Sequence, residues 1–166
     1  MITYTLLNKS EKYTWLPRLF DLYYINMCSI APSVLSREDE RTQWLASVSP
    51  ALDKAPRQIL LCCSDGLLSG FIQYYTRGEL LMIEEVQLTT DCQHSTVFLG
   101  FIRALIRQLP REIRYVEAYA DKRNRRSIDL MHRLGMQELT EAEGSPFLHF
   151  KGNAAKILPV FTGNKL

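Results

Sequence analysis

The sequence predicts a mixed α/β domain, in which helices cover both faces of a central sheet of parallel and antiparallel strands. Between residues 79 and 109, apolar residues first alternate up to Leu88 and then recur every three or four positions from Phe98. Alternation is typical of a strand, and the longer period is typical of an amphipathic helix. The turn signals Asp65-Gly66 and Arg77-Gly78 precede this segment and predict two consecutive hairpins. Another apolar strand follows the helix, so the two strands that the helix joins should run parallel.

Length and composition indicate one ordinary globular domain. The chain has 166 residues and a formal net charge of +2, which excludes a strongly basic nucleic-acid-binding protein. We expect no signal peptide and no membrane span, because the first residues lack a basic region before an apolar run and no apolar stretch approaches about 18 residues. Cys28, Cys62, Cys63 and Cys92 have the spacing of neither a zinc site nor a redox pair. We therefore expect no metal site and a reducing, cytoplasmic setting.

The N-terminal half should contain a strand followed by two helices. Alternation indicates a strand over residues 2–7, and an apolar stripe predicts a helix over residues 12–28. A second helix is expected over residues 33–48, because Ser36 followed by Asp39 resembles a capping box. Two prolines within residues 49–56 should break this helix.

The remaining elements follow from the same local signals. Further strands are expected over residues 57–64, 67–76, 80–89, 113–120, 136–139 and 147–151, and helices over residues 96–109 and 124–134, which end before Pro110 and at Gly135. Residues 1–151 should therefore form a single domain, and residues 152–166 a C-terminal tail that is poorly ordered or docks on a neighbour. The apolar run Ile157–Phe161 in this tail favours a homodimer.

The polar turn at residues 90–95 stands where a strand gives way to a helix. The first turn of a helix leaves backbone N–H groups unpaired, and its dipole favours an anion by about 0.3–1 kcal/mol. A phosphate group could bind there. The alternative is a plain connection between strand and helix, with Ser95 or Thr96 as the N-cap.

Three segments resemble the GNAT superfamily of N-acetyltransferases. Residues 83–88, Ile-Glu-Glu-Val-Gln-Leu, are similar to the acidic fourth strand of members that acetylate amines. Gln93 and the residues after it align with the (Arg/Gln)-x-x-Gly-x-(Gly/Ala) pyrophosphate loop. Residues 124–136 resemble the family's Asn-x-x-Ser/Ala-x-x-x-Tyr-x-x-x-Gly-Phe helix. The predicted element order, β-α-α-β-β-β-α-β-α-β-β, is also that of the family.

The resemblance implies an N-acyltransferase that takes acetyl-CoA as co-substrate. Glu84 would be the general base, and the backbone N–H at Leu88 would polarise the thioester carbonyl. The cofactor-binding residues would be Leu88, Gln93, His94, Ser95, Thr96, Val97, Asn124 and Ser127. The acceptor would be a primary amine of a small molecule or of a protein.

Three residues depart from the family pattern. Thr96 and Phe98 stand at the glycine positions of the phosphate loop, and Gly100 follows two residues later. Met131 stands at the tyrosine that commonly protonates the leaving thiolate, and a thioether cannot donate a proton. These departures favour a second hypothesis, a catalytically inactive GNAT-fold protein that acts in binding or regulation.

Overall fold

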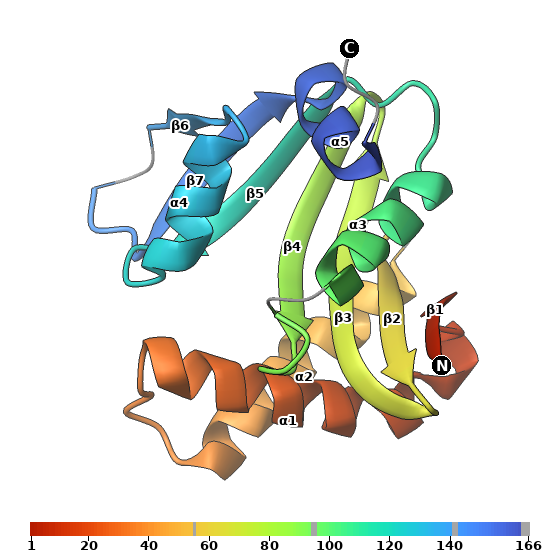
Figure 1. Cartoon of the computed structure of the whole chain (residues 1–166). Coiled ribbons are helices and arrows are strands. Elements are labelled where there is room, and N and C mark those ends of the chain that lie inside the picture. Colours follow the sequence, from red (N-terminus) through yellow and green to blue (C-terminus); the bar gives the residue numbers. More distant parts are fainter. Residues whose placement is uncertain (55, 94–95, 141–142, 164–166) are drawn as a thin grey trace. The chain divides into compact units, whose positions relative to one another are not determined.

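The computed structural model describes residues 1–54, 56–93, 96–140 and 143–163 and confirms the mixed α/β fold (Figure 1). Seven strands form one sheet in the order β1-β2-β3-β4-β5-β7-β6. The strands are β1 (Ile2–Leu6), β2 (Gln58–Ser64), β3 (Leu67–Arg77), β4 (Leu80–Leu88), β5 (Tyr115–Asp121), β6 (Gln137–Leu139) and β7 (Phe147–Asn153). The helices are η1 (Lys9–Glu11), α1 (Lys12–Ile30), α2 (Arg37–Asp53), α3 (Thr96–Gln108), α4 (Arg125–Arg133) and α5 (Ala154–Thr162).

The chain divides into two compact units. The first comprises Met1–Gln73 and Glu85–Phe101, and the second comprises Tyr74–Glu84 and the chain from Ile102 onward. β3, β4 and α3 therefore contribute residues to both units.

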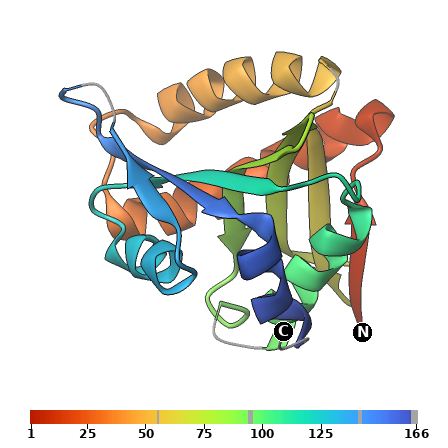
Figure 2. The ribbon, with the colours of Figure 1, turned by 90° about the horizontal axis from the view of Figure 1, so that it is seen from above.

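In the first unit, alternation along β1 and β2 directs side chains toward different helices. The two strands pair antiparallel, with Tyr4 opposite Cys62. One face joins the core with α1 and α2, which includes Leu7, Leu16, Leu19, Leu22, Val48, Leu52, Ile59, Leu61, Cys63 and Phe71. On the other face, Tyr4 stacks on Phe101 of α3, with 5.7 Å between ring centroids. Figure 2 shows α2 and the start of α3 on opposite sides of β2 and β3.

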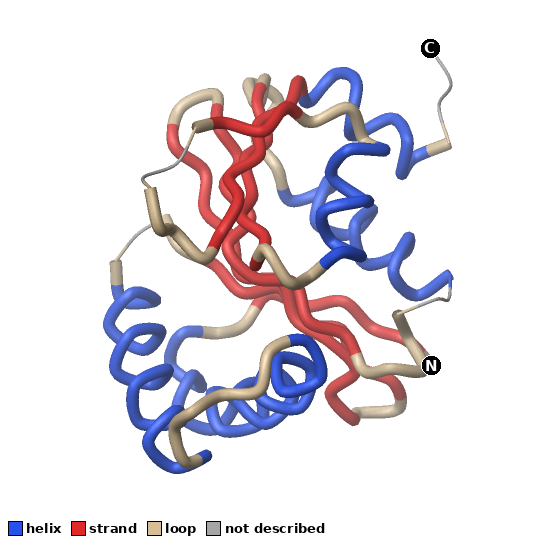
Figure 3. The backbone as a smooth tube through the Cα atoms, turned by 90° about the vertical axis from the view of Figure 1, so that its left-hand side faces the viewer, coloured by secondary structure: helices blue, strands red, loops and turns tan. Residues whose placement is uncertain are grey.

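The second helix of the first unit differs from the expected range 33–48 at both ends, since it runs from Arg37 to Asp53. α1 and α2 pack against each other, with 5.9 Å between the ring centroids of Phe20 and Trp44 (Figure 3). The hydroxyl oxygen of Ser36 accepts from the Asp39 N–H at 3.1 Å, so the predicted cap is confirmed. However, α2 continues through Pro50 to Asp53. Proline removes one helical hydrogen bond, but Leu52 beyond it is only 1% exposed, and this burial favours the last turn.

In the second unit, helices cover one face of β7. β5 runs parallel to β4, as predicted, and antiparallel to β7. Phe150 of β7 contacts the ring of His132 on α4, with 5.4 Å between centroids. Gly152, two positions along the same face, has no Cβ, which leaves room for Ile157 of α5.

The C-terminal tail, which was expected to be poorly ordered or to dock on a neighbour, forms the helix α5 over residues 154–162. The Asn153 side chain accepts from the Ala155 N–H at 2.8 Å and caps the helix. Ile157 and Phe161 are buried one turn apart, and the carbonyl of Phe161 accepts from Nε of Arg103 at 2.6 Å. The proline at position 159 obscured this helical pattern in the sequence.

Candidate functional site

The end of β4, in the first unit, is held by three hydrogen bonds that converge on one peptide group. The carbonyl oxygen of Leu88 accepts from Nδ2 of Asn26 at 2.9 Å and from Nε2 of Gln93 at 3.0 Å. The N–H of the same peptide group, on Thr89, donates to the carbonyl oxygen of Ser69 at 2.9 Å. A carbonyl oxygen has two lone pairs, and both have a donor here. The peptide that leads from the strand into the loop is therefore fixed in orientation.

Asn26 is a site residue that the sequence analysis missed. It lies on α1, is 8% exposed, and donates from Nδ2 to Oε1 of Gln87 at 2.8 Å as well as to Leu88. Nε2 of Gln87 in turn donates to Oε1 of Glu85 at 2.6 Å. A single asparagine within an apolar helical stripe gives no local sign of a hydrogen-bonding role, because its partner Gln87 lies 61 residues further along the chain. The result is a chain of side-chain bonds from α1 to the polar residues of β4.

The loop after β4 begins as a compact turn. The carbonyl oxygen of Thr89 accepts from the N–H groups of Cys92 and Gln93 at 2.9 and 3.1 Å. Because the Gln93 side chain also returns to β4, this residue closes the turn through both its backbone and its amide. The predicted residues His94 and Ser95 lie outside the described residues.

α3 begins at Thr96 and contains no acidic residue in its first turn. The Thr96 residue is exposed, and Val97 is half-buried. N–H groups in the first turn of a helix have no intrahelical partner, and the helix dipole favours an anion there. The helix dipole therefore favours negative charge near the start of α3.

Gly100 on α3 serves packing within the first unit. A Cβ at this position would collide with the hydroxyl of Tyr4, so the glycine admits the tyrosine ring. The same hydroxyl donates to the carbonyl oxygen of Val97 at 3.3 Å. The contact ties β1 to the first turns of α3.

In the second unit, β4 and β5 pair along only part of their length. Their parallel register runs from Leu80 opposite Tyr115 to Ile83 opposite Ala118. Both strands continue beyond these residues, β4 to Leu88 and β5 to Asp121. Glu84, the predicted base, is half-buried and is the first residue of β4 past the paired segment.

The predicted residues of α4 have a local structural role. The Asn124 side-chain oxygen accepts from the Ser127 N–H at 3.1 Å and caps the helix. The positive charge of Lys122 and Arg123, which precede α4, is balanced in part by Asp121. Its carboxylate binds Nε and Nη2 of Arg123 at 3.0 and 2.9 Å. These hydrogen bonds from Arg123 hold the pKa of Asp121 below its ordinary value.

Comparison with known proteins reveals similarity in fold and none in sequence: no model of a protein family and no curated protein matches the chain. The PaiA N-acetyltransferase of Thermoplasma acidophilum, in complex with coenzyme A, matches with a TM-score of 0.68 at 12% identity, over 92% of this chain and 99% of that chain. A protein of Desulfovibrio desulfuricans, assigned to the GNAT family of acetyltransferases, matches with a TM-score of 0.66 at 11% identity, over 92% and 99%. The fold is that of the GNAT acetyltransferases. YncA of Salmonella typhimurium, solved with its cofactor acetyl-CoA, matches with a TM-score of 0.59 at 13% identity, over 92% and 94%.

The predicted site residues are divided between the two units. Leu88, Gln93, Thr96 and Val97 belong to the first unit, at the strand end, the loop and the helix start. Glu84, Asn124 and Ser127 belong to the second unit, on β4 and at the start of α4.

Thr96 and Phe98, which replace the glycines of the GNAT pattern, both lie in the first turn of α3. The helix begins at Thr96, which is exposed, and Phe98 is half-buried. Met131 lies on α4 and cannot donate a proton.

A second polar cluster, around Glu117 on β5, was also missed in the sequence. Glu117 is 8% exposed, and its carboxylate binds Nε2 of His149 at 3.0 Å and Nζ of Lys151 at 2.8 Å. Burial raises the pKa of Glu117, but the hydrogen bonds from Lys151 and His149 outweigh it and hold this pKa below its ordinary value. No local sequence signal indicates the pair of Glu117 and His149, because the two residues lie 32 positions apart.

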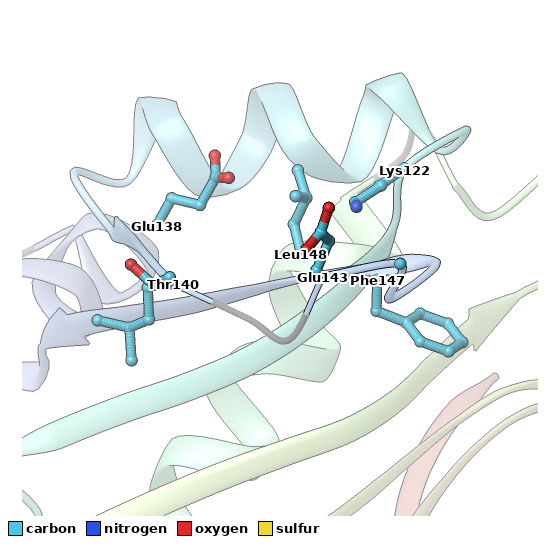
Figure 4. Close-up of a pocket in the computed structure, with 8 residues that line it drawn as sticks. Lys122, Glu138, Thr140, Glu143, Phe147 and Leu148 are labelled. Atoms are coloured by element: carbon cyan, nitrogen blue, oxygen red, sulfur yellow. The ribbon is translucent and has the colours of Figure 1, made fainter.

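The second unit also has a hollow of about 480 Å³ beside β6 and β7 (Figure 4). Lys122, Glu138 and Glu143 are among the residues that line it. None of the predicted site residues that the structure describes is among the residues that line it.

Two further observations concern the described part of the chain as a whole. No helix there is long and apolar enough to span a bilayer. The His, Cys, Asp and Glu side chains there form no group of three or more that could hold a metal ion.

Proposed function

We propose that this protein is an acetyl-CoA-dependent N-acyltransferase that transfers an acetyl group to a primary amine of a small molecule or a protein. The observation that carries the proposal is the likeness in fold to acetyltransferases solved with coenzyme A or acetyl-CoA. The limited pairing of β4 with β5 also supports it, because the two strands pair only from Leu80 to Ile83 and β4 continues to Leu88.

In this proposal the first unit holds the co-substrate. The pyrophosphate would bind to the loop and the first turn of α3, at Gln93, His94, Ser95, Thr96 and Val97. The fixed peptide at the end of β4 supports a role of the Leu88 backbone N–H as the donor to the thioester carbonyl, since it limits movement of the strand end. Removal of one such donor costs about 2.7–4 kcal/mol in transition-state stabilisation where it has been tested.

Three further predicted residues, Glu84, Asn124 and Ser127, belong to the second unit. Asn124 and Ser127 would contribute to binding of the co-substrate. The acceptor nitrogen attacks the acetyl carbonyl carbon, a C–N bond forms and the C–S bond breaks. Glu84 would take the proton from the nitrogen, directly or through a water molecule. The thiolate would take its proton from solvent, because Met131 has none to give.

Ligand binding is tested first, by thermal unfolding with and without acetyl-CoA. A ligand at about one hundred times its dissociation constant stabilises the native state by about 2.7 kcal/mol. We expect the melting temperature to rise with acetyl-CoA concentration. No shift at millimolar acetyl-CoA would contradict the proposal.

The base is tested with Glu84→Gln, and Glu85→Gln is the matched control on the neighbouring position of β4. We expect Glu84→Gln to lower the rate of acetyl transfer and to flatten its dependence on pH, because the glutamine cannot accept a proton. The Glu85→Gln variant should keep the wild-type pH profile. An unchanged profile in Glu84→Gln would remove Glu84 from this role.

Location and assembly complete the proposal. All four cysteines are free thiols, which supports a reducing, cytoplasmic setting. The homodimer remains a proposal, in which the exposed Val160 of α5 would be one contact, and sedimentation would test it.

A further inference from the structure

Three aromatic side chains of the second unit are exposed on one face of the sheet. Tyr115 and Tyr119 on β5 are 42% and 44% exposed, and Phe147 on β7 is 45% exposed. The antiparallel register pairs Tyr119 with His149 and Asp121 with Phe147, and paired residues point to the same face. We call this set of three aromatic residues, with Glu117, His149 and Lys151 among them, the aromatic face.

The exposure is confined to one side of β7. The opposite side is covered by α4 and α5 through Phe150 and Gly152. In Figure 4, Leu148 points toward α4 and the Phe147 ring points to the opposite side of the strand. The helices of this unit therefore leave the aromatic face to solvent, and clustered exposed apolar side chains of this kind mark binding sites.

The buried carboxylate of Glu117 fixes the rings of this face. His149 binds Glu117 through Nε2 and stacks on Tyr119, with 4.3 Å between ring centroids and 14° between ring planes. Lys151 binds the other carboxylate oxygen and lies 4.9 Å from the centroid of Tyr115. Rings held in this way lose little further conformational freedom when a ligand binds.

The composition of the face matches a site for a small aromatic molecule. Small-molecule sites are lined mostly by apolar and aromatic side chains, with a few polar groups that set orientation. A flat ring gains most from an offset or edge contact with another ring, and the Tyr119–His149 stack offers a surface of two nearly parallel rings.

Glu84 lies toward the same face of the sheet. Met82 pairs with Glu117, and Glu84 is two positions further along β4. Ile83 and Ala118 are the last paired residues of β4 and β5, and Glu84 and Tyr119 are the next residues of these strands. A ring that lies against Tyr119 would thus have the Glu84 carboxylate of β4 on the neighbouring strand.

We propose that the aromatic face binds the acceptor and that the acceptor is a primary amine whose molecule also contains an aromatic ring. The ring lies against Tyr119, and the amine extends toward Glu84. Glu117 is a positioning residue, since it acts through His149 and Lys151. The assignment of the ligand as acceptor rests on the proposed acetyl transfer, whereas the binding of an aromatic amine does not.

The experiment compares tyramine, an aromatic primary amine, with n-butylamine, an aliphatic one. Binding of each to the full chain is measured by calorimetry, and acetyl transfer from acetyl-CoA is measured separately. We expect tyramine to bind more tightly than n-butylamine. Tyr119→Ala should weaken tyramine binding about five- to tenfold, the size of one aromatic pair, and leave n-butylamine unchanged.

Three variants keep the comparison specific. Tyr119→Phe retains the ring and should retain tyramine affinity. Phe147→Ala should also weaken tyramine binding, and it takes the place of Tyr119→Ala if that variant does not fold. Tyr13→Ala, at a 73% exposed tyrosine on α1, is the matched control and should change neither affinity.

Equal affinity for the two amines, or undiminished tyramine binding in both alanine variants of the face, would overturn the proposal. A dimer that Tyr119→Ala converts to a monomer, with both affinities unchanged, would also overturn it and make the face an interface between copies. Tyramine binding that depends on Tyr119 without any acetyl transfer would leave the binding site standing and contradict the enzyme.

Discussion

Asn26 offers the sharpest test of how the end of β4 is held. Asn26→Leu keeps the size of the side chain and removes both donors. The carbonyl of Leu88 keeps Gln93 as a donor, whereas Oε1 of Gln87 loses the Asn26 amide, at a residue that is only 6% exposed. A buried polar group left unsatisfied costs about 1–3 kcal/mol.

We therefore expect Asn26→Leu to lower the free energy of unfolding by about 2 kcal/mol. For a chain of this length that corresponds to a melting temperature lower by roughly 4–8 °C. Urea unfolding followed by circular dichroism measures the change. The neighbouring Ile25→Ala is the matched control, because Ile25 is 63% exposed on the same helix, and its effect should stay within about 0.5 kcal/mol.

A double-mutant cycle separates the hydrogen bond from simple loss of packing. With Gln87→Leu already present, Asn26→Leu should cost less than it does alone, since the orphaned acceptor is gone. If Asn26→Leu is as stable as the wild type, or if the cycle shows no coupling, the chain of bonds from α1 to β4 does not hold the strand end.

Two further predictions test other contacts. Gly100→Ala should destabilise the protein by about 1–3 kcal/mol, because the added methyl meets the Tyr4 hydroxyl. The loss of stability should be smaller in the Tyr4→Phe background, which lacks this hydroxyl. An equal loss in both backgrounds would refute this explanation. Glu117→Gln should lower stability by about 1–3 kcal/mol at pH 7, through the loss of charge-assisted hydrogen bonds. The native pKa of Glu117 is depressed, so its contribution is present above the unfolded pKa and disappears as pH falls through the native one. Urea unfolding should then show wild type and variant converging at acid pH, and a constant difference between pH 7 and pH 3 would contradict the linkage.

The elements that could be predicted from the sequence are those with local signals. The Ser36 cap, the Asp65-Gly66 turn and the Gly135 stop each depend on residues only a few positions apart. The turn has φ of 50° and 82° at its two residues, which is the conformation that the pair Asp-Gly favours.

The sequence suggests candidate site residues but not the contacts that support them. The Tyr4 hydroxyl and Val97 are 93 residues apart, and Asn26 and Gln87 are 61 apart. Pairings over such distances depend on how the whole unit folds, and no window of the sequence displays them. Gln93 was predicted from its resemblance to a ligand-binding loop, and its bond to the Leu88 carbonyl became apparent only from the structure.

The peptide group between residues 88 and 89 has a consequence for kinetics. To rotate it would break its three hydrogen bonds, each worth about 1 kcal/mol, so roughly one molecule in a hundred or fewer would hold the rotated form. A ligand that docks on this strand end therefore meets a surface that is already in its final form. Differences in affinity among related ligands should then arise mainly from differences in their dissociation rates.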